Sequence, residues 1–251
     1  IAVRIQRDRL NDDLRNNRVE GEAEIAAARR DMERLSAEYD QKTKDIRNAF
    51  RVSDRVYITS IADNHVKSGP LTIGFGGSEE KIGPELGFGM SLAGRVNSPI
   101  LIIKTAWGGK SLHYDFRPPG AGAYELSEQE RVKDDAAAIR EKAGSNFRLM
   151  IARVREVLGQ LKAFHPGFDE SAGYDLAGFV WLQGFNDQFS PEFRDNYEKN
   201  MVTFVKDVRR EFQAENLPFV IGVLGTSITE EEVGKNVVSL GQRAAAATPD
   251  F

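Results

Sequence analysis

Residues 99–111 read PILIIKTAWGGKS, an apolar run that ends in a pair of glycines. Four consecutive apolar residues at 100–103 are typical of a strand that is buried on both faces of a parallel sheet. Similar short apolar runs occur at 56–59, 177–182 and 218–224. These four runs predict the strands of the domain, and the loops that follow them become the places to search for function, because ligands bind beyond the carboxyl ends of parallel strands.

Helical patterns separate the predicted strands. Apolar residues with 3-4 spacing form one stripe over 147–164 and another over 193–212. The second stripe begins at Ser190-Pro191, which predicts a serine cap and a proline at the first helical position. A last helix is expected from Thr229, with Glu232 completing a capping box, to residue 247. Strands that alternate with helices predict an α/β fold with a parallel sheet and helices on both faces.

Residues 1–50 differ in kind from the rest, because 22 of these 50 residues are charged. The apolar spacing from Ile25 onward predicts one face of a long helix, and residues 16–21 could turn the chain into a helical hairpin. Two interpretations stay open. The segment is either a solvated helical insertion that packs on its own domain, or a coiled-coil arm for self-association or a protein partner.

Composition excludes several functions. The 251 residues carry 34 lysines and arginines against 38 aspartates and glutamates, so the net charge is 34 − 38 = −4 and no bulk basic surface for nucleic acid is expected. There is no cysteine, and the three histidines have no metal-ligand spacing, so a metal site built on these side chains is not expected. No apolar run is long enough to predict a membrane span.

The glycine pair Gly108-Gly109 can turn the backbone sharply and present N–H groups to an anion. The sequence Gly109-Lys110-Ser111 suggests a phosphate loop, but that motif requires glycine at position 104, where this chain has Lys104. Nucleotide binding is therefore not expected. The alternative to an anion site is a glycine turn with a purely structural role.

After the run at 177–182 comes Gln183-Gly184-Phe185-Asn186-Asp187. The amide of Asn186 could donate to a developing negative charge, and Asp187 could orient a neighbour or bind a sugar hydroxyl. The alternative is a turn in which both side chains only satisfy the backbone. Arg117 could clamp a carboxylate or pair with Asp115.

Four motifs in order resemble the sialate O-acetylesterase-type branch of the SGNH hydrolases, over residues 51–251. The resemblance is carried by Gly83-Pro84-Glu85-Leu86-Gly87-Phe88-Gly89, Lys104-Thr105-Ala106-Trp107-Gly108-Gly109-Lys110-Ser111-Leu112, Asp115-Phe116-Arg117-Pro118-Pro119 and Trp181-Leu182-Gln183-Gly184-Phe185-Asn186-Asp187. It implies a three-layer, flavodoxin-like sheet and a carbohydrate esterase that needs no cofactor. Residues 1–50 do not share the resemblance.

The resemblance implies an oxyanion hole made by the N–H of Gly108 or Gly109 and by the amide of Asn186. It also places Gln183, Asp187, Lys110 and Arg117 as candidates for holding an O-acetylated carbohydrate. Many relatives have glutamate where this chain has Phe185. The family's Gly-Gln-Ser nucleophile block and Asp-x-x-His block do not occur in the sequence and are expected before residue 1 and after residue 251.

The function expected from these residues is therefore that of a serine esterase acting on O-acetylated carbohydrate. The alternative is a catalytically inactive, esterase-like protein that binds a glycan or serves assembly. By resemblance alone, a secreted or periplasmic location is expected.

Overall fold

The computed structural model describes residues 2–16, 18–19, 21–49, 52–62, 66–79, 81–225 and 234–249. The chain divides into two compact units, and each is described by itself. One unit comprises Ile1–Ile58 and Lys67–Ile102, and the other comprises Thr59–Val66 and Ile103–Phe251.

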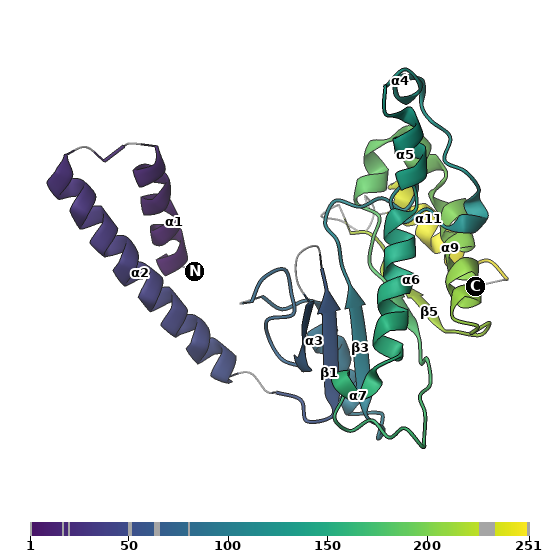
Figure 1. Cartoon of the computed structure of the whole chain (residues 1–251), viewed down its shortest axis with the longest axis horizontal. Helices are drawn as coiled ribbons and strands as arrows, with labels where there is room; N and C mark the ends of the chain where they lie inside the picture. Colours follow the sequence, from purple (N-terminus) through teal and green to yellow (C-terminus); the bar gives the residue numbers. More distant parts are fainter. Residues whose placement is uncertain are drawn as a thin grey trace. The chain divides into compact units, whose positions relative to one another are not determined.

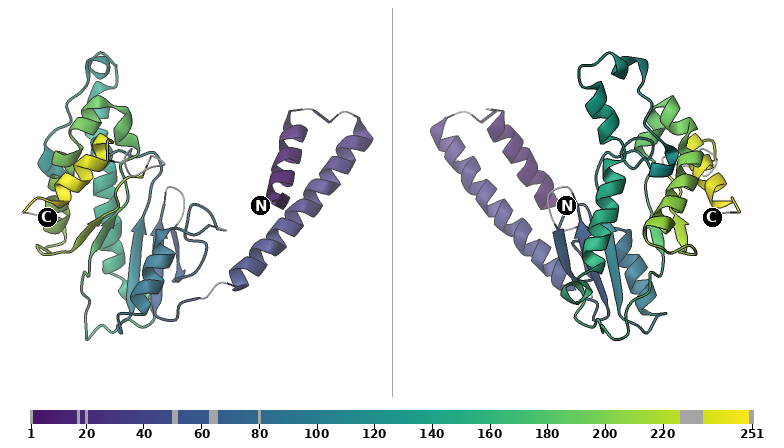
Figure 2. Two further views of the ribbon diagram at one scale, coloured as in Figure 1. Left: turned by 180° about the vertical axis from the view of Figure 1, so that it is seen from behind. Right: turned by 45° about the vertical axis from the view of Figure 1, so that its right-hand side comes forward.

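The first unit begins with two helices, α1 (Ala2–Arg15) and α2 (Glu22–Ala49), which contact each other as a hairpin (Figure 2). The guanidinium of Arg7 lies 4.6 Å from the ring centroid of Tyr39, which joins the two arms. Five side chains of α2 that are buried or partly buried repeat with 3-4 spacing, namely Ile25, Ala28, Met32, Leu35 and Tyr39. They belong to the stripe that the sequence predicts, although Ser36 and Glu38 are also partly buried. The side chains of Ile46 and Ala49, which would continue it, lie outside the described residues.

A three-stranded sheet follows, with the order β2-β1-β3. Its strands are β1 (Val56–Ile61), β2 (Val66–Pro70) and β3 (Ile100–Thr105), and Figure 1 shows β1 and β3 pointing the same way. The N–H of Ala106 donates to the carbonyl of Ile61 at the ends of β1 and β3. Strand β2 lies outside the four apolar runs from which the sequence analysis predicts strands.

Helix α3 (Pro84–Ala93) packs closely in the first unit because Gly89 has no side chain. A Cβ atom at Gly89 would overlap the side chain of Leu71 and contact Ile102. The small core of this unit consists of buried residues with partly buried neighbours around them: Val56, Ile58, Leu71 and Phe75, with Leu86, Ala93, Ile100 and Ile102.

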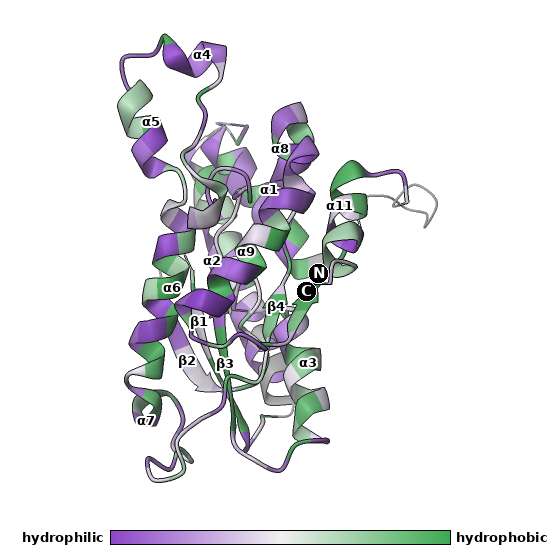
Figure 3. Ribbon diagram, turned by 90° about the vertical axis from the view of Figure 1, so that its right-hand side faces the viewer, coloured by the Kyte–Doolittle hydropathy of each residue, from purple (hydrophilic) through white to green (hydrophobic). Residues whose placement is uncertain are grey.

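The second unit is mostly helical. Its helices are η1 (Pro119–Ala121), α4 (Glu128–Arg131), α5 (Ala136–Lys142), α6 (Ser145–Leu158), α7 (Leu161–Phe164), η2 (Asn186–Phe189), α8 (Pro191–Asp195), α9 (Tyr197–Glu211) and α11 (Val237–Ala246). Polar and apolar residues alternate along α6 in Figure 3, as the predicted stripe requires. Each of the two long predicted helices is interrupted once. The first is divided into α6 and α7, and the second into α8 and α9.

The predicted helix caps fit only in part. Pro191 stands at the first position of α8 as expected, but the side chain of Ser190 makes no capping hydrogen bond. Helix α11 is capped by Asn236, whose side chain accepts from the N–H of Ser239 at 3.1 Å. The expected cap at Thr229 and its partner Glu232 lie outside the described residues.

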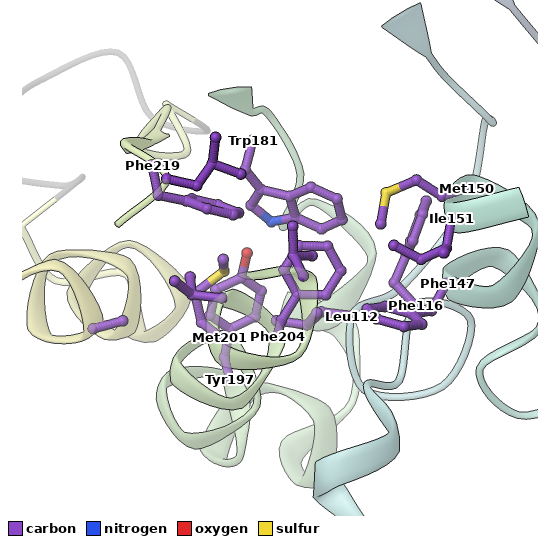
Figure 4. Close-up of a cluster of buried hydrophobic side chains, with 14 of the residues drawn as sticks. Leu112, Phe116, Phe147, Met150, Ile151, Trp181, Tyr197, Met201, Phe204 and Phe219 are labelled. Carbon is purple, nitrogen blue, oxygen red and sulfur yellow. The ribbon is translucent and has the colours of Figure 1, made fainter. Parts of the chain in front are cut away.

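Strands β4 (Phe179–Trp181) and β5 (Phe219–Ile221) form a second, parallel sheet, in which Val180 faces Val220 in register. The first and last residues of each strand point into the core. There the ring centroids of Trp181 and Phe204 are 4.4 Å apart (Figure 4). Val180 and Val220 are 43% and 57% exposed. The apolar runs predicted strands that are buried on both faces, and this pair is buried on one.

The fold is therefore mixed α/β, with small sheets and many helices. Within the described residues the strands form two sheets, so the expected single sheet with helices on both faces is not confirmed. None of the helices that the structure describes combines the length and apolar character needed to cross a membrane.

Candidate functional site

Two loops at strand ends meet in the second unit. The loop after β3 contains Gly109, whose backbone has a φ of +69°, a left-handed conformation that favours glycine. The loop after β4 leads into the helix η2, whose first residue is Asn186. A Cβ atom at Gly109 would lie 3.7 Å from Nδ2 of Asn186, so the glycine backbone and the side-chain amide converge.

The donors at this point of convergence are not engaged elsewhere. Among the described residues, no hydrogen bond involves the backbone N–H of Gly108, the backbone N–H of Gly109 or the side-chain amide of Asn186. Both glycines are exposed and Asn186 is half-buried. Three polar donors without partners, on residues that retain exposed surface, could bind an oxyanion.

Asp187, the next residue, is completely buried and holds the two loops together. Its Oδ1 accepts from the N–H groups of Leu112 and His113, each at 3.0 Å, and its Oδ2 accepts from the N–H of Leu112 at 2.9 Å. Burial raises the pKa of the Asp187 carboxyl, against the opposing effect of these hydrogen bonds. A side chain with no exposed surface positions the loop and has no surface to offer a sugar.

Gln183 is engaged in the same way. Its Nε2 donates to Oδ2 of Asp187 at 2.6 Å and to the carbonyl of Lys110 at 2.9 Å, and its Oε1 accepts from the hydroxyl of Tyr197 at 3.1 Å. The carbonyl of Gln183 accepts from Nε2 of Gln242 at 2.8 Å. The amide therefore links the β4 end to the β3 loop and to α9.

Tyr197 and Gln242 belong to this support, and the sequence analysis did not single them out. Both are fully buried. The sequence feature that could have identified Gln242 is a polar side chain within an apolar helical stripe. Gln242 lies on α11 between Val238 and Ala245, which are both buried. A buried polar group must find hydrogen-bond partners, and these lie at the strand end.

Asp115 and Ser111 fold the β3 loop onto itself. Oδ2 of Asp115 accepts from the N–H of Ser111 at 2.8 Å and from its hydroxyl at 3.1 Å. The ammonium of Lys110 lies 3.4 Å from Oδ1 of the same carboxylate. The charge of Lys110 is therefore paired within the loop.

Arg117 does not pair with Asp115. Its guanidinium donates instead to four backbone carbonyls, at distances of 2.9 to 3.2 Å: those of His113, Ala121, Gly122 and Ala123. Burial lowers the pKa of Arg117. These bonds fasten the segment that follows the site, so the geometry favours a structural role for Arg117 over a substrate clamp.

His113 is buried beside this segment, with 5% of its surface exposed. Nδ1 lies 3.1 Å from Nδ2 of Asn200, Nε2 lies 3.6 Å from a carboxylate oxygen of Glu192, and the ring stacks on Phe193 with centroids 4.6 Å apart. Burial, followed by the nearby charge of Arg117, lowers the pKa of His113 from 6.5 to about 4. The imidazole is therefore neutral at pH 7.

The part of the chain that the structure describes contains no cluster of three or more side chains able to hold a metal ion. The candidate site consists instead of backbone N–H groups and one carboxamide. This set of donors suits a negatively charged oxygen.

The chain is therefore a mixed α/β protein in which donors without partners among the described residues lie where two strand-end loops meet. The family model described as "Carbohydrate esterase, sialic acid-specific acetylesterase" matches residues 53–249, and the chain belongs to this family. Helices α1 and α2 lie outside the matched residues.

Among solved structures, the X-ray structure of a protein from Arabidopsis thaliana is similar, with 15% sequence identity and a TM-score of 0.48. The match covers 78% of this chain and 66% of that chain, so the present chain spans slightly less than two thirds of its length. A search of curated proteins found no match.

Proposed function

We propose that the protein hydrolyses O-acetyl esters of carbohydrates by a serine mechanism and that this chain provides the oxyanion hole. One observation carries the proposal. A Cβ at Gly109 would lie 3.7 Å from Nδ2 of Asn186, and the donors on both sides are unengaged within the described residues. Membership of a carbohydrate esterase family supports the ester as substrate.

In this mechanism a serine oxygen attacks the carbon of the acetyl carbonyl while a histidine takes the serine proton, and the electron pair of the carbonyl moves to its oxygen. The N–H of Gly108 or Gly109 and the amide of Asn186 donate to that oxygen while it is negative. The bond from carbon to the sugar oxygen then breaks, a histidine returns the proton to the departing oxygen, and water releases acetate by the same route. The proposal assigns no residue of this chain as nucleophile or base, because neither family block occurs in it.

Two of the expected substrate residues take a positioning role in this proposal. The carboxylate of Asp187 and the amide of Gln183 hold the loops at the ends of β3 and β4, and this support fixes the direction of the donors. Arg117 fastens the following segment through backbone carbonyls. Lys110 stays a candidate for contact with substrate hydroxyls through its partly exposed side chain.

We further propose that the family domain is three-layered and flavodoxin-like and that residues 1–50 are a helical insertion in it. The contact of α1 with α2 favours a segment that packs on itself. Self-association through residues 1–50 stays a prediction. It requires a molecular mass that rises with concentration and no longer does so once residues 1–50 are deleted. The secreted or periplasmic location also stays a prediction.

The experiment that tests the esterase is Asn186→Ala in the full-length gene product, assayed with an aryl acetate. Losing one oxyanion donor typically lowers kcat by about 10²–10³. Asn216→Ala is the matched control, because it makes the same chemical change at an exposed residue before β5. Equal kcat values for Asn186→Ala and wild type would remove Asn186 from the mechanism.

The alternative, an esterase-like protein that binds a glycan without catalysis, gives a different result. The wild-type protein would then bind the carbohydrate and show no hydrolysis of any acetyl ester.

A further inference from the structure

Helix α11 reaches the candidate site through one carboxamide. Gln242 is completely buried, and both ends of its side-chain amide are engaged. Its Nε2 donates to the carbonyl of Gln183 at 2.8 Å and to the hydroxyl of Tyr197 at 3.3 Å, and its Oε1 accepts from the N–H of Leu224 at 2.7 Å. Because Gln183 follows β4 and Leu224 follows β5, a single side chain joins the ends of two strands to α11.

Gly184 allows the helix to come this close. A Cβ at Gly184 would lie 2.9 Å from Cγ1 of Val238 and 3.1 Å from Nε2 of Gln242, so a side chain there would collide with α11. The φ of Gly184 is +144°, which residues with a side chain rarely adopt. The turn that leads to Asn186 therefore has a glycine at its contact with the helix.

The same helix also contacts the turn on the other side of Asn186. Asn236 caps α11, and its Nδ2 donates to Oε1 of Gln188 at 3.3 Å. Helix α11 therefore holds the turn both before and after Asn186.

The contacts of Gln242 require an amide. The carbonyl of Gln183 needs a donor and the N–H of Leu224 needs an acceptor, and a buried polar group that loses its partner is costly. A carboxamide offers both at a fixed spacing. Packing alone is served by apolar side chains, such as those of Val238 and Ala245 on the same helix.

We infer that Gln242 is a positioning residue of the oxyanion hole, which acts through Gln183 and Gly184 on the direction of the Asn186 amide. This inference rests on the proposed function and deepens it. It assigns a role in turnover to a completely buried side chain of α11.

The test is Gln242→Glu in the full-length gene product. The protonated carboxyl reproduces the amide, because its O–H can donate to the carbonyl of Gln183 while its C=O accepts from the N–H of Leu224. Once the carboxyl ionises, an oxygen without a proton faces the carbonyl of Gln183 and that hydrogen bond is lost. Burial raises the pKa of a carboxyl, so the measurements extend from about pH 5.5 to about pH 9.

The quantity measured is kcat for an aryl acetate, divided by the wild-type kcat at the same pH. For Gln242→Glu this ratio is expected to be near one while the carboxyl is protonated and to fall about tenfold as it ionises, with KM changed less than threefold. A merely structural role would reduce the folded fraction and leave kcat per folded molecule unchanged.

Two controls separate these effects. Gln129→Glu makes the same chemical change at an exposed residue of α4 and should keep the ratio at one. Arg209→Met removes the hydrogen bonds from α9 to the carbonyl of Leu217, which precedes β5. It should lower the melting temperature and leave kcat per folded molecule unchanged.

Gln242→Met is a second variant, which decides the question if the ionised Gln242→Glu unfolds. It keeps an unbranched side chain and removes all three hydrogen bonds, so its kcat should be at least about tenfold lower at every pH. Equal kcat of Gln242→Met and the wild type, measured per folded molecule, would overturn the inference.

Failure of the esterase proposal is a separate result, in which the wild type hydrolyses no acetyl ester. The inference is then tested by the ¹H–¹⁵N signals of the Asn186 side chain, which are identified by their absence in Asn186→Ala. These signals should differ from those of the wild type in Gln242→Met and coincide with them in Gln129→Glu. Unchanged Asn186 signals in Gln242→Met would rule out the positioning role.

Discussion

The backbone N–H of Leu112 donates to both carboxylate oxygens of Asp187, at 3.0 and 2.9 Å. The two residues are 75 positions apart in the sequence, and their contact joins the loop after β3 to the loop after β4. The distance between Gly109 and Asn186 therefore depends on a carboxylate that is completely buried. A residue with a structural role thus sets the geometry of the proposed oxyanion hole.

Replacing Asp187 by asparagine should cost both stability and activity. The new NH₂ group replaces one acceptor oxygen and faces a donor, either the N–H of His113 at the Oδ1 position or Nε2 of Gln183 at the Oδ2 position, while the N–H of Leu112 keeps the remaining oxygen. Because a buried donor then lacks an acceptor, the free energy of unfolding should fall by about 2–3 kcal/mol in denaturant titrations. In the folded fraction, kcat should fall more than KM changes, because the ground-state contacts remain. Asp195→Asn, at an exposed side chain, is the control, and equal loss in both variants would contradict the positioning role.

The glycine pair allows a test that separates its two members. Gly109→Ala should cost about 1–2 kcal/mol of stability, because its backbone is left-handed, while the new methyl makes only an ordinary van der Waals contact with Nδ2 of Asn186. Gly108→Ala should be nearly neutral in stability, because its φ is not positive and no atom lies within 4 Å of the added Cβ. Thermal unfolding and aryl acetate hydrolysis of both variants provide the comparison. A larger loss of stability in Gly108→Ala would show that the turn is not as described.

The local sequence predicted a candidate site in the loops after β3 and β4, and this site stays a prediction. The sequence did not predict the hydrogen bonds that the side chains of these loops make. Apolar runs located β1, β3, β4 and β5 but not β2, and the glycine pair and Asn186 became candidates through their positions after those runs. The partners of Asp187 and Gln183 could not be predicted, because a hydrogen bond to the backbone of Leu112 leaves no trace in the pattern around either residue. The exposed Val180 shows the same limit, since an apolar run does not reveal how many faces of a strand are covered.

Replacing Arg117 distinguishes a structural role of its side chain from a role in substrate binding. Its guanidinium donates to four backbone carbonyls, and glutamine cannot replace those bonds. Arg117→Gln should therefore lower the free energy of unfolding by about 2–3 kcal/mol, while KM for an acetylated sugar changes less than threefold in the folded protein. Arg153→Gln, at an exposed residue of α6, is the control. A large rise in KM with unchanged stability would restore the role of substrate clamp.

The buried His113 should make stability depend on pH. Its pKa lies near 4 in the folded protein and near 6.5 in the unfolded chain, so between these values the unfolded state binds a proton that the folded state excludes. The contribution of His113 is fully present above pH 6.5 and is lost as pH falls toward 4. Over that window the loss is about 3 kcal/mol, since each unit of pKa difference corresponds to about 1.4 kcal/mol.

Urea titrations of wild type and His113→Gln at pH 7 and pH 4.5 isolate this effect, because other titrating groups are common to both. Glutamine keeps an acceptor for Asn200 and carries no titrating proton. The free energy of unfolding of His113→Gln should therefore fall less between the two pH values than that of the wild type. Equal losses in the two proteins would mean that the imidazole is already accessible to protons in the folded state, which its burial against Phe193 argues against.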